Sequence, residues 1–179
     1  MAYTKQFVRS KAPIFSKTLK NFGDINSSML SIIDELEKTE KSNISNVRAW
    51  HTHGYIHKDF EEFAPLLDKC IEFIHQVNNQ EYLLPRAALD YECANMWGMK
   101  YKPGDDATPH NHFPADWVFV YYLDVVPGQS PLVIENLEYF PKNNELIMFH
   151  GIIDHYVPKV TTPRTAISMN FMHTGFKQQ

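Results

Sequence analysis

After residue 80 the sequence consists of short apolar or aromatic runs separated by turn-forming residues. The runs include WVFVYYLDVV, LVIENLEYF, ELIMFHGI and TAISMNFMH, and the separators include PGDD, PGQSP and PKNN. Short strands at regular spacing, bounded by Gly, Pro, Asn and Asp, are typical of all-β sandwiches and barrels. Residues 81–179 are therefore predicted to form a β core.

Residues 1–80 have a different pattern, which predicts two surface helices. From Ile25 to Leu36 apolar residues recur at helical spacing, with Asn26, Ser27 or Ser28 as the candidate N-cap. A second helix is predicted from near Pro65 to about residue 80, and its expected apolar stripe is Leu67, Ile71, Ile74 and Val77. A short edge strand is expected near Pro13. Because 179 residues suit one domain, we expect a single domain 1–179 in which residues 1–80 form a helical support for the core.

Composition and charge narrow the class of partner. The chain is 44% hydrophobic, which is typical of a folded globule, and its net charge of −4 with scattered Lys and Arg argues against nucleic acid as a partner. The two cysteines, Cys70 and Cys93, are too few for a disulfide framework, and we expect both to be buried. No apolar run approaches a membrane span, so we expect a cytoplasmic protein without membrane contact, and a homo-oligomer is compatible with the sequence.

One pattern of histidines predicts a metal site. His110 and His112 stand two residues apart, so on a strand both side chains would point to the same face, and His155 falls in or just before a later strand. Imidazole nitrogens bind Zn, Cu, Fe and Ni, so the ligand type does not select the metal. Ordinary polar histidines are the alternative interpretation.

A second His-x-His pattern competes with the first. His51 and His53, with His57 nearby, have the spacing of metal ligands, but Gly54 interrupts the strand pattern and no further strand histidine is left to complete this set. We therefore expect these histidines to cover a pocket or to bond to backbone groups.

Arg164 follows His155 by nine residues and suggests an acidic ligand. A buried guanidinium must be paired, and its planar fork matches a carboxylate in two places. A dicarboxylate ligand would supply that partner. A structural ion pair with Asp154 or Glu145 is the alternative.

At these positions the chain resembles the iron(II)- and 2-oxoglutarate-dependent dioxygenases, in the branch that includes the prolyl hydroxylases and small bacterial and phage relatives. The matching motifs are Tyr101-x-x-Gly104, His110-x-His112, the run Val120-Tyr-Tyr-Leu123, and His155 with Arg164. The resemblance covers roughly residues 89–172.

The resemblance implies a double-stranded β-helix, or jelly roll, that holds Fe(II) near its open end. His110, His112 and His155 would bind the metal. Arg164 would pair with the C5 carboxylate of the cosubstrate 2-oxoglutarate, and the Ser168 hydroxyl would add a donor from the same strand face. Tyr101 and Tyr122 occupy positions where relatives hydrogen-bond the cosubstrate, although each also suits simple core packing. Trp97, Trp117 and Phe119 are further candidates for the pocket wall.

His112 departs from the family pattern, which usually has a carboxylate there. The first interpretation is a three-His face with no negative charge. The alternative is that Asp116, four residues later, turns in as the anionic ligand.

The leading function is therefore an oxygenase that uses Fe(II), O2 and 2-oxoglutarate, hydroxylates an amino-acid, peptidyl or small-molecule substrate, and releases succinate and CO2. One alternative is a three-His iron dioxygenase that uses no keto acid, in which Arg164 would hold the substrate's own carboxylate. The other is a non-catalytic metal-binding jelly roll.

Overall fold

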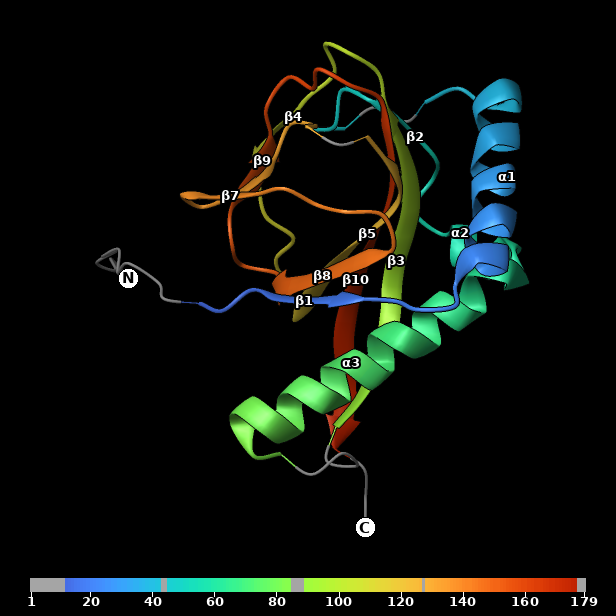
Figure 1. The fold of residues 1–179 in the computed structure, drawn as a ribbon. Helices are drawn as coiled ribbons and strands as arrows, with labels where there is room; N and C mark the ends of the chain where they lie inside the picture. The colour runs from blue at the N-terminus through green and yellow to red at the C-terminus, as the bar shows by residue number, and fades with distance from the viewer. Residues whose placement is uncertain (1–11, 43–44, 85–88, 127, 177–179) are drawn as a thin grey trace, which may run out of the picture.

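Two antiparallel sheets lie face to face, and helices cover the outer side of the larger one (Figure 1). In the computed structural model the described residues are 12–42, 45–84, 89–126 and 128–176. The larger sheet has the order β1-β8-β5-β10-β3-β2, with bounds Phe15–Thr18, Glu145–His150, Trp117–Val125, Arg164–Phe176, Leu89–Tyr101 and Trp50–His51. The smaller sheet has the order β4-β9-β6-β7, with bounds Ala107–His110, His155–Val157, Leu132–Ile134 and Leu137–Tyr139.

This arrangement confirms the expected mainly β fold with N-terminal helices, built as a jelly roll. β10 shows how alternation divides the interior, because its neighbours pair on both sides and its side chains point to two different layers. Ile167, Met169 and Phe171 face the helices, whereas Ala166 and Arg164 face the smaller sheet. Polar side chains of β10 can therefore reach the space between the sheets only from the positions that face the smaller sheet.

Helix α1 (Gly23–Thr39) begins earlier than the sequence indicated. The predicted N-cap at residues 26–28 is wrong, since Phe22 precedes the first turn and the hydroxyls of Ser27 and Ser28 instead donate to carbonyls one turn back. Phe22 is buried against Tyr121 in a T-shaped ring contact. Its burial fixes the entry of the chain into the helix, which a polar cap signal does not reveal.

Helix α3 (Ala64–Tyr82) has Pro65 in its first turn, as predicted, but its buried stripe is centred about one residue earlier than expected. The predicted Ile74 and Val77 are buried, but Leu67 and Ile71 are only partly so. The other buried residues of the stripe are Leu66, Cys70 and Phe73. The aromatic ring decides the rotation, because Phe73 packs on Phe119 of β5. The helix also runs two residues past Gln80, and buried Asn78 donates to the Tyr91 hydroxyl of β3 at 2.9 Å.

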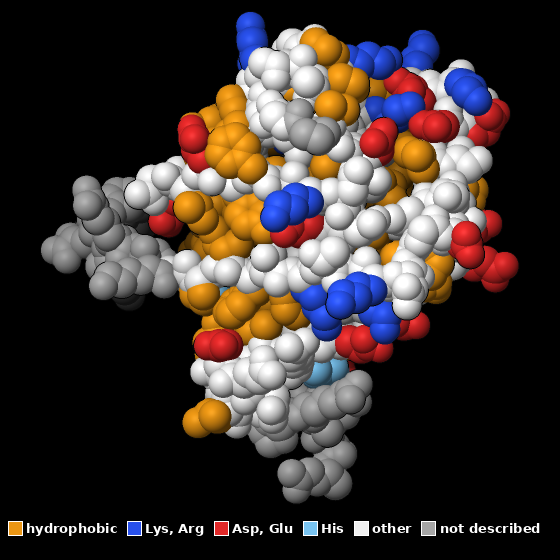
Figure 2. All heavy atoms as spheres, in the orientation of Figure 1, with side chains coloured by type: hydrophobic (Ala, Val, Ile, Leu, Met, Phe, Trp, Pro, Cys, Tyr) orange, Lys and Arg blue, Asp and Glu red, His pale blue; other side chains and the backbone are white. Residues whose placement is uncertain are grey.

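Two short helical segments, α2 (Ile56–Asp59) and the 3₁₀ helix η1 (Glu61–Phe63), connect β2 to α3. Both cysteines are free thiols; Cys70 is fully buried and Cys93 half-buried. None of the helices in the described part of the chain is long and apolar enough to cross a membrane. On the face that Figure 2 shows, Lys and Arg side chains lie interspersed with Asp and Glu.

Candidate functional site

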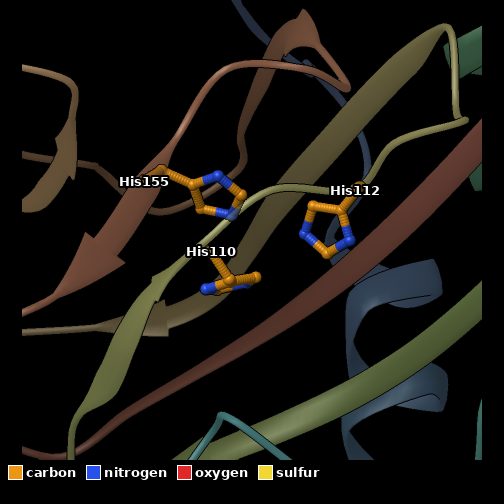
Figure 3. Close-up of side chains that lie close together, drawn as sticks. All are labelled: His110, His112 and His155. Carbon is orange, nitrogen blue, oxygen red and sulfur yellow. The ribbon is translucent and has the colours of Figure 1, made fainter. Parts of the chain in front are cut away.

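Three imidazoles converge between the sheets (Figure 3). His110 ends β4, His112 lies in the loop that follows, and His155 begins β9. The nitrogen atoms that they offer all lie within 4.8 Å of one another, and among the described residues no other His, Cys, Asp or Glu joins a comparable group. The three rings therefore form a face of nitrogen donors around one point.

The strand pairing explains two of the three positions. His110 and His155 are direct partners in the β4–β9 ladder, and their ring centroids are 4.4 Å apart. The prediction that His112 shares the strand with His110 is wrong, because β4 ends at His110. His112 reaches the same space because its backbone N–H donates to the Gly151 carbonyl at 2.7 Å, which ties its loop to the chain just before His155.

Backbone carbonyls orient the His110 and His155 rings. His110 Nδ1 lies 2.7 Å from the Thr108 carbonyl, and His155 Nδ1 lies 3.1 Å from the Ile153 carbonyl. Since a carbonyl only accepts, each Nδ1 carries the proton and each Nε2 keeps its lone pair. This is the usual support for a histidine that binds a metal through Nε2.

The rings are held in their neutral form. Burial lowers the pKa of His112 to about 3 and that of His155 to about 4, with smaller contributions from the neighbouring imidazoles. Burial also lowers the pKa of His110. At neutral pH no proton competes for the three lone pairs.

A pocket extends from the imidazoles to Arg164. It holds about 420 Å³ of space, part of it open to solvent, and its wall includes Arg164 and Ser168 from one face of β10. Tyr101 of β3 and Tyr122 of β5 complete the inner end. The fold thus brings together the four residues that the sequence predicted for the cosubstrate site.

Arg164 is buried without an acidic partner. Its side chain is 3% exposed, Nη1 donates to the Ser130 carbonyl at 2.9 Å, and Nε has no hydrogen-bond partner. Among the described residues no carboxylate forms an ion pair with it: Glu145 accepts from the Lys142 N–H, and Asp154 accepts from Asn111. The structural ion pair considered above is therefore not formed, and the guanidinium has capacity left for an anion.

Two tyrosines surround the guanidinium. Its carbon lies 4.7 Å from the ring centroid of Tyr101 and 5.9 Å from that of Tyr122. Burial raises the pKa of Tyr101 to about 12, which the charge of Arg164 partly offsets, and burial likewise raises the pKa of Tyr122. Both phenols therefore stay protonated and are able to donate.

Asp116 faces away from the imidazoles. Its Oδ2 accepts from the backbone N–H of His173 at 2.7 Å and from the ring Nδ1 of the same residue at 2.9 Å. Because its carboxylate is bonded to His173, Asp116 is not placed to act as the anionic metal ligand.

The competing histidines do not assemble. His51 is buried between the Ser45 hydroxyl and the Thr52 carbonyl, and His53 forms an ion pair with Asp59 at 3.1 Å. His57 takes part in no metal-type group of the described residues. These contacts agree with the expectation that the loop histidines bond to backbone and nearby polar groups.

Sequence reasoning missed several parts of the pocket. Val47 and Leu132 line it, and the carbonyl of Ser130 binds Arg164. Backbone groups and single aliphatic residues carry no motif that could have indicated them. Of the aromatic candidates only Trp97 lines the pocket, because Trp117 and Phe119 point to the helix side of the sheet.

Comparison with known proteins gives structural relatives only. No family model matches the chain, and no curated protein matches it in sequence. A viral collagen prolyl hydroxylase from Paramecium Bursaria Chlorella virus-1, in complex with 2OG, has 14% identity and a TM-score of 0.63 over 87% of this chain and 94% of its own. A prolyl hydroxylase from Trichoplax adhaerens, in complex with a hypoxia inducible factor peptide fragment, has 14% identity and a TM-score of 0.65 over 90% and 84%.

A third solved structure is the non-heme alpha ketoglutarate dependent epimerase SnoN from nogalamycin biosynthesis. It has 11% identity and a TM-score of 0.68 over 90% of this chain and 78% of its own. At such low identity the likeness concerns the path of the backbone rather than the chemistry. The chain has the jelly-roll fold of the 2-oxoglutarate-dependent non-heme iron oxygenases.

Proposed function

We propose that this protein is an Fe(II)- and 2-oxoglutarate-dependent oxygenase that hydroxylates an amino-acid, peptidyl or small-molecule substrate and releases succinate and CO2. The observation that carries the proposal is the buried Arg164, which has no acidic partner among the described residues and shares one pocket with three convergent imidazoles. The solved structures with the same fold include a prolyl hydroxylase in complex with 2OG and an epimerase described as alpha ketoglutarate dependent, which supports the proposal.

The residues present fit both groups. The neutral imidazoles His110, His112 and His155 offer three lone pairs on one side of a cation, and three is the number of protein ligands that leaves positions for other molecules on a non-heme iron. The Nε–H group of Arg164, which has no hydrogen-bond partner, can donate to a carboxylate oxygen.

Each residue would then have a distinct task. Arg164 pairs with the C5 carboxylate of 2-oxoglutarate, and the Ser168, Tyr101 and Tyr122 hydroxyls, which line the same pocket, are available to hydrogen-bond it. The apolar part of the wall would limit the contact of the cosubstrate with water. When bound, Fe(II) with 2-oxoglutarate supplies the O2-dependent oxidation that the protein residues themselves cannot perform.

A second candidate is an iron dioxygenase that uses no keto acid. The three neutral ligands favour it, because the usual carboxylate is replaced by His112 and Asp116 is bonded to His173. In that enzyme Arg164 would hold a carboxylate of the substrate itself.

Spectroscopy of the anaerobic Fe(II) protein separates these candidates. We expect added 2-oxoglutarate to produce a weak visible charge-transfer band and O2 then to yield succinate. Arg164→Ala should abolish both while the metal content stays nearly intact, and the exposed Arg48→Ala is the matched control that should keep both. A wild-type protein that binds iron without the band would favour the second candidate, and failure to bind any divalent ion at micromolar concentration would favour a non-catalytic protein.

A cytoplasmic location is part of the proposal, consistent with the two free thiols. The exclusion of nucleic acid and the capacity to form a homo-oligomer stay predictions from the sequence.

A further inference from the structure

A second groove begins at the imidazoles, on a side that Arg164 does not reach. It shares Val47, Trp97, His110 and His112 with the Arg164 pocket. It holds about 630 Å³ of space, partly open to solvent. Its outer wall is residues 45–54, here called the strap. A molecule in this groove would lie next to the metal without displacing a ligand bound to Arg164.

The groove is lined by neutral groups. Among the described residues, none of those that line it is Asp, Glu, Lys or Arg. The exposed Asn46 amide offers hydrogen bonds, and Trp97 offers an aromatic surface. At its border Asp154 accepts a hydrogen bond from Asn111, and Arg48 forms an ion pair with Asp106.

The strap is fixed before any ligand arrives. It is anchored on one side where Thr52 N–H donates to the Gly98 carbonyl of β3, and on the other where the Thr108 N–H donates to the Asn46 carbonyl beside β4. His51, 6% exposed, braces the space between: its Nδ1 donates to the Thr52 carbonyl at 3.0 Å, so its Nε2 accepts from the Ser45 hydroxyl at 2.9 Å. The wall therefore includes a buried imidazole that is held at both ring nitrogens.

We propose that this groove receives the substrate of the proposed oxygenase and that the substrate group entering it carries no charge. This inference rests on the proposed function, because it takes the molecule in the groove to be the substrate of that oxygenase. A charged group in the groove would lose hydration without meeting a side chain of opposite charge among those that line it, which costs several-fold more than placing an amide or hydroxyl there. His112 strengthens the selection against cations, because it replaces the carboxylate that would otherwise lie beside the groove.

Probes of one shape and different charge test the proposal. Protein loaded with Mn(II) and 2-oxoglutarate, which occupies Arg164, is titrated with cyclohexanecarboxamide, cyclohexanecarboxylate or cyclohexylmethylammonium. Broadening of each probe's NMR signals by Mn(II) reports binding next to the metal. We expect the amide to bind about tenfold more tightly than either charged probe.

Two variants that place a charge on the groove wall test the same proposal. The Asn46 side chain is exposed, so Asn46→Asp and Asn46→Lys should both fold. Asn46→Asp should bring the ammonium probe to an affinity equal to or above that of the amide, and Asn46→Lys should do the same for the carboxylate. Equal binding of all three probes by the wild type, no broadening of any probe, or a ranking that neither variant changes would each overturn the proposal.

Failure of the proposed function would be seen separately. Mn(II) loading is measured beforehand by electron paramagnetic resonance, and if no metal binds, the oxygenase proposal fails while the groove is still tested on metal-free protein through the indole N–H signal of Trp97. A shift of that signal with the amide alone supports an uncharged-ligand groove. A shift with the charged probes at equal concentration contradicts it.

Discussion

His112 sets the charge of the candidate metal centre. Its ring stacks on that of His155 at a centroid distance of 5.0 Å and contacts Trp97 at 5.7 Å, so it is held on both sides. With three neutral imidazoles and Asp116 bonded to His173, none of the described side chains in this group offers a cation an anionic ligand. The full charge of the metal is therefore left for anionic ligands to neutralise.

Replacing this ring with a carboxylate should tighten metal binding. His112→Asp is expected to lower the dissociation constant for Mn(II) by about tenfold, because an anion is brought next to the cation. Isothermal titration of the purified variants with Mn(II) measures it. Asp116→Asn is the control and should leave the affinity unchanged. Unaltered binding by His112→Asp, or a large loss in Asp116→Asn, would show that the ligand set is different.

The buried imidazoles also make the metal-free protein sensitive to acid. In the unfolded chain a histidine takes up a proton near its ordinary pKa of 6.5, but in the fold His112 does so only near 3 and His155 near 4. Between pH 6.5 and about 4 the unfolded state binds more protons, so acid favours unfolding and stability rises with pH.

Urea unfolding of metal-free protein measures that effect. Lowering the pH from 7 to 5 should reduce the free energy of unfolding by about 2 kcal/mol for each of the two imidazoles. His112→Asn should lose its share of this dependence. An identical pH dependence in variant and wild type would mean that His112 is not buried as described.

At the level of the secondary-structure elements, the strap shows how one His-x-His pattern can serve packing. His51 joins Ser45 to Thr52 and its own N–H donates to the Ser42 hydroxyl at 3.1 Å, whereas His53 is half-exposed beside Asp59. The same motif thus contains a structural brace and a surface residue.

Alanine at each position should separate the two roles. His51→Ala removes a buried ring and leaves the Ser45 hydroxyl without its acceptor, so we expect a loss of about 2–3 kcal/mol in the free energy of unfolding. His53→Ala should cost less than about 1 kcal/mol, as is usual for an exposed ion pair. Denaturant titration compares them directly. Equal losses would contradict the bracing role of His51.

One loop carries His112 and another precedes His155, and Gly151 holds the two loops together. A Cβ at Gly151 would lie 2.0 Å from the Ala115 carbonyl oxygen, a clash that only a backbone shift can relieve. The Gly151 carbonyl accepts from His112 N–H and its N–H donates to the Asp116 carbonyl, so the shift would move a candidate ligand.

Gly151→Ala should therefore weaken Mn(II) binding by about tenfold or more and also lower the melting temperature. Gly54→Ala is the matched control, since a Cβ there meets its nearest atom at an ordinary 3.8 Å. Calorimetric titration and thermal unfolding of both variants decide the matter. Wild-type Mn(II) affinity in Gly151→Ala would show that these loops tolerate movement or do not hold the metal.

For the molecule as a whole, the sequence predicted the β core well because turn-forming residues stand at both ends of each apolar run. The strands from Trp117 to Phe176 coincide with apolar runs, and alternation correctly placed Arg164 and Ser168 on one face. Periodicity located both helices but neither the start of α1 nor the whole buried stripe of α3, since the packing of Phe22 and Phe73 depends on partners far along the chain.

The candidate site was only partly accessible to sequence reasoning. The resemblance identified the imidazoles and Arg164, but it gave no reason for His112 to reach the others from outside β4, because that depends on a backbone hydrogen bond to Gly151. The substrate groove was equally hidden, since its wall is set by the contacts of His51 with Ser45 and Thr52.

A crystal structure of the protein grown with Mn(II) and 2-oxoglutarate, without O2, tests the central claim most directly. We predict the metal bound by His110, His112 and His155, with the C5 carboxylate of 2-oxoglutarate paired to Arg164. A metal held by other residues, or 2-oxoglutarate bound with Arg164 facing the Ser130 carbonyl alone, would contradict the account.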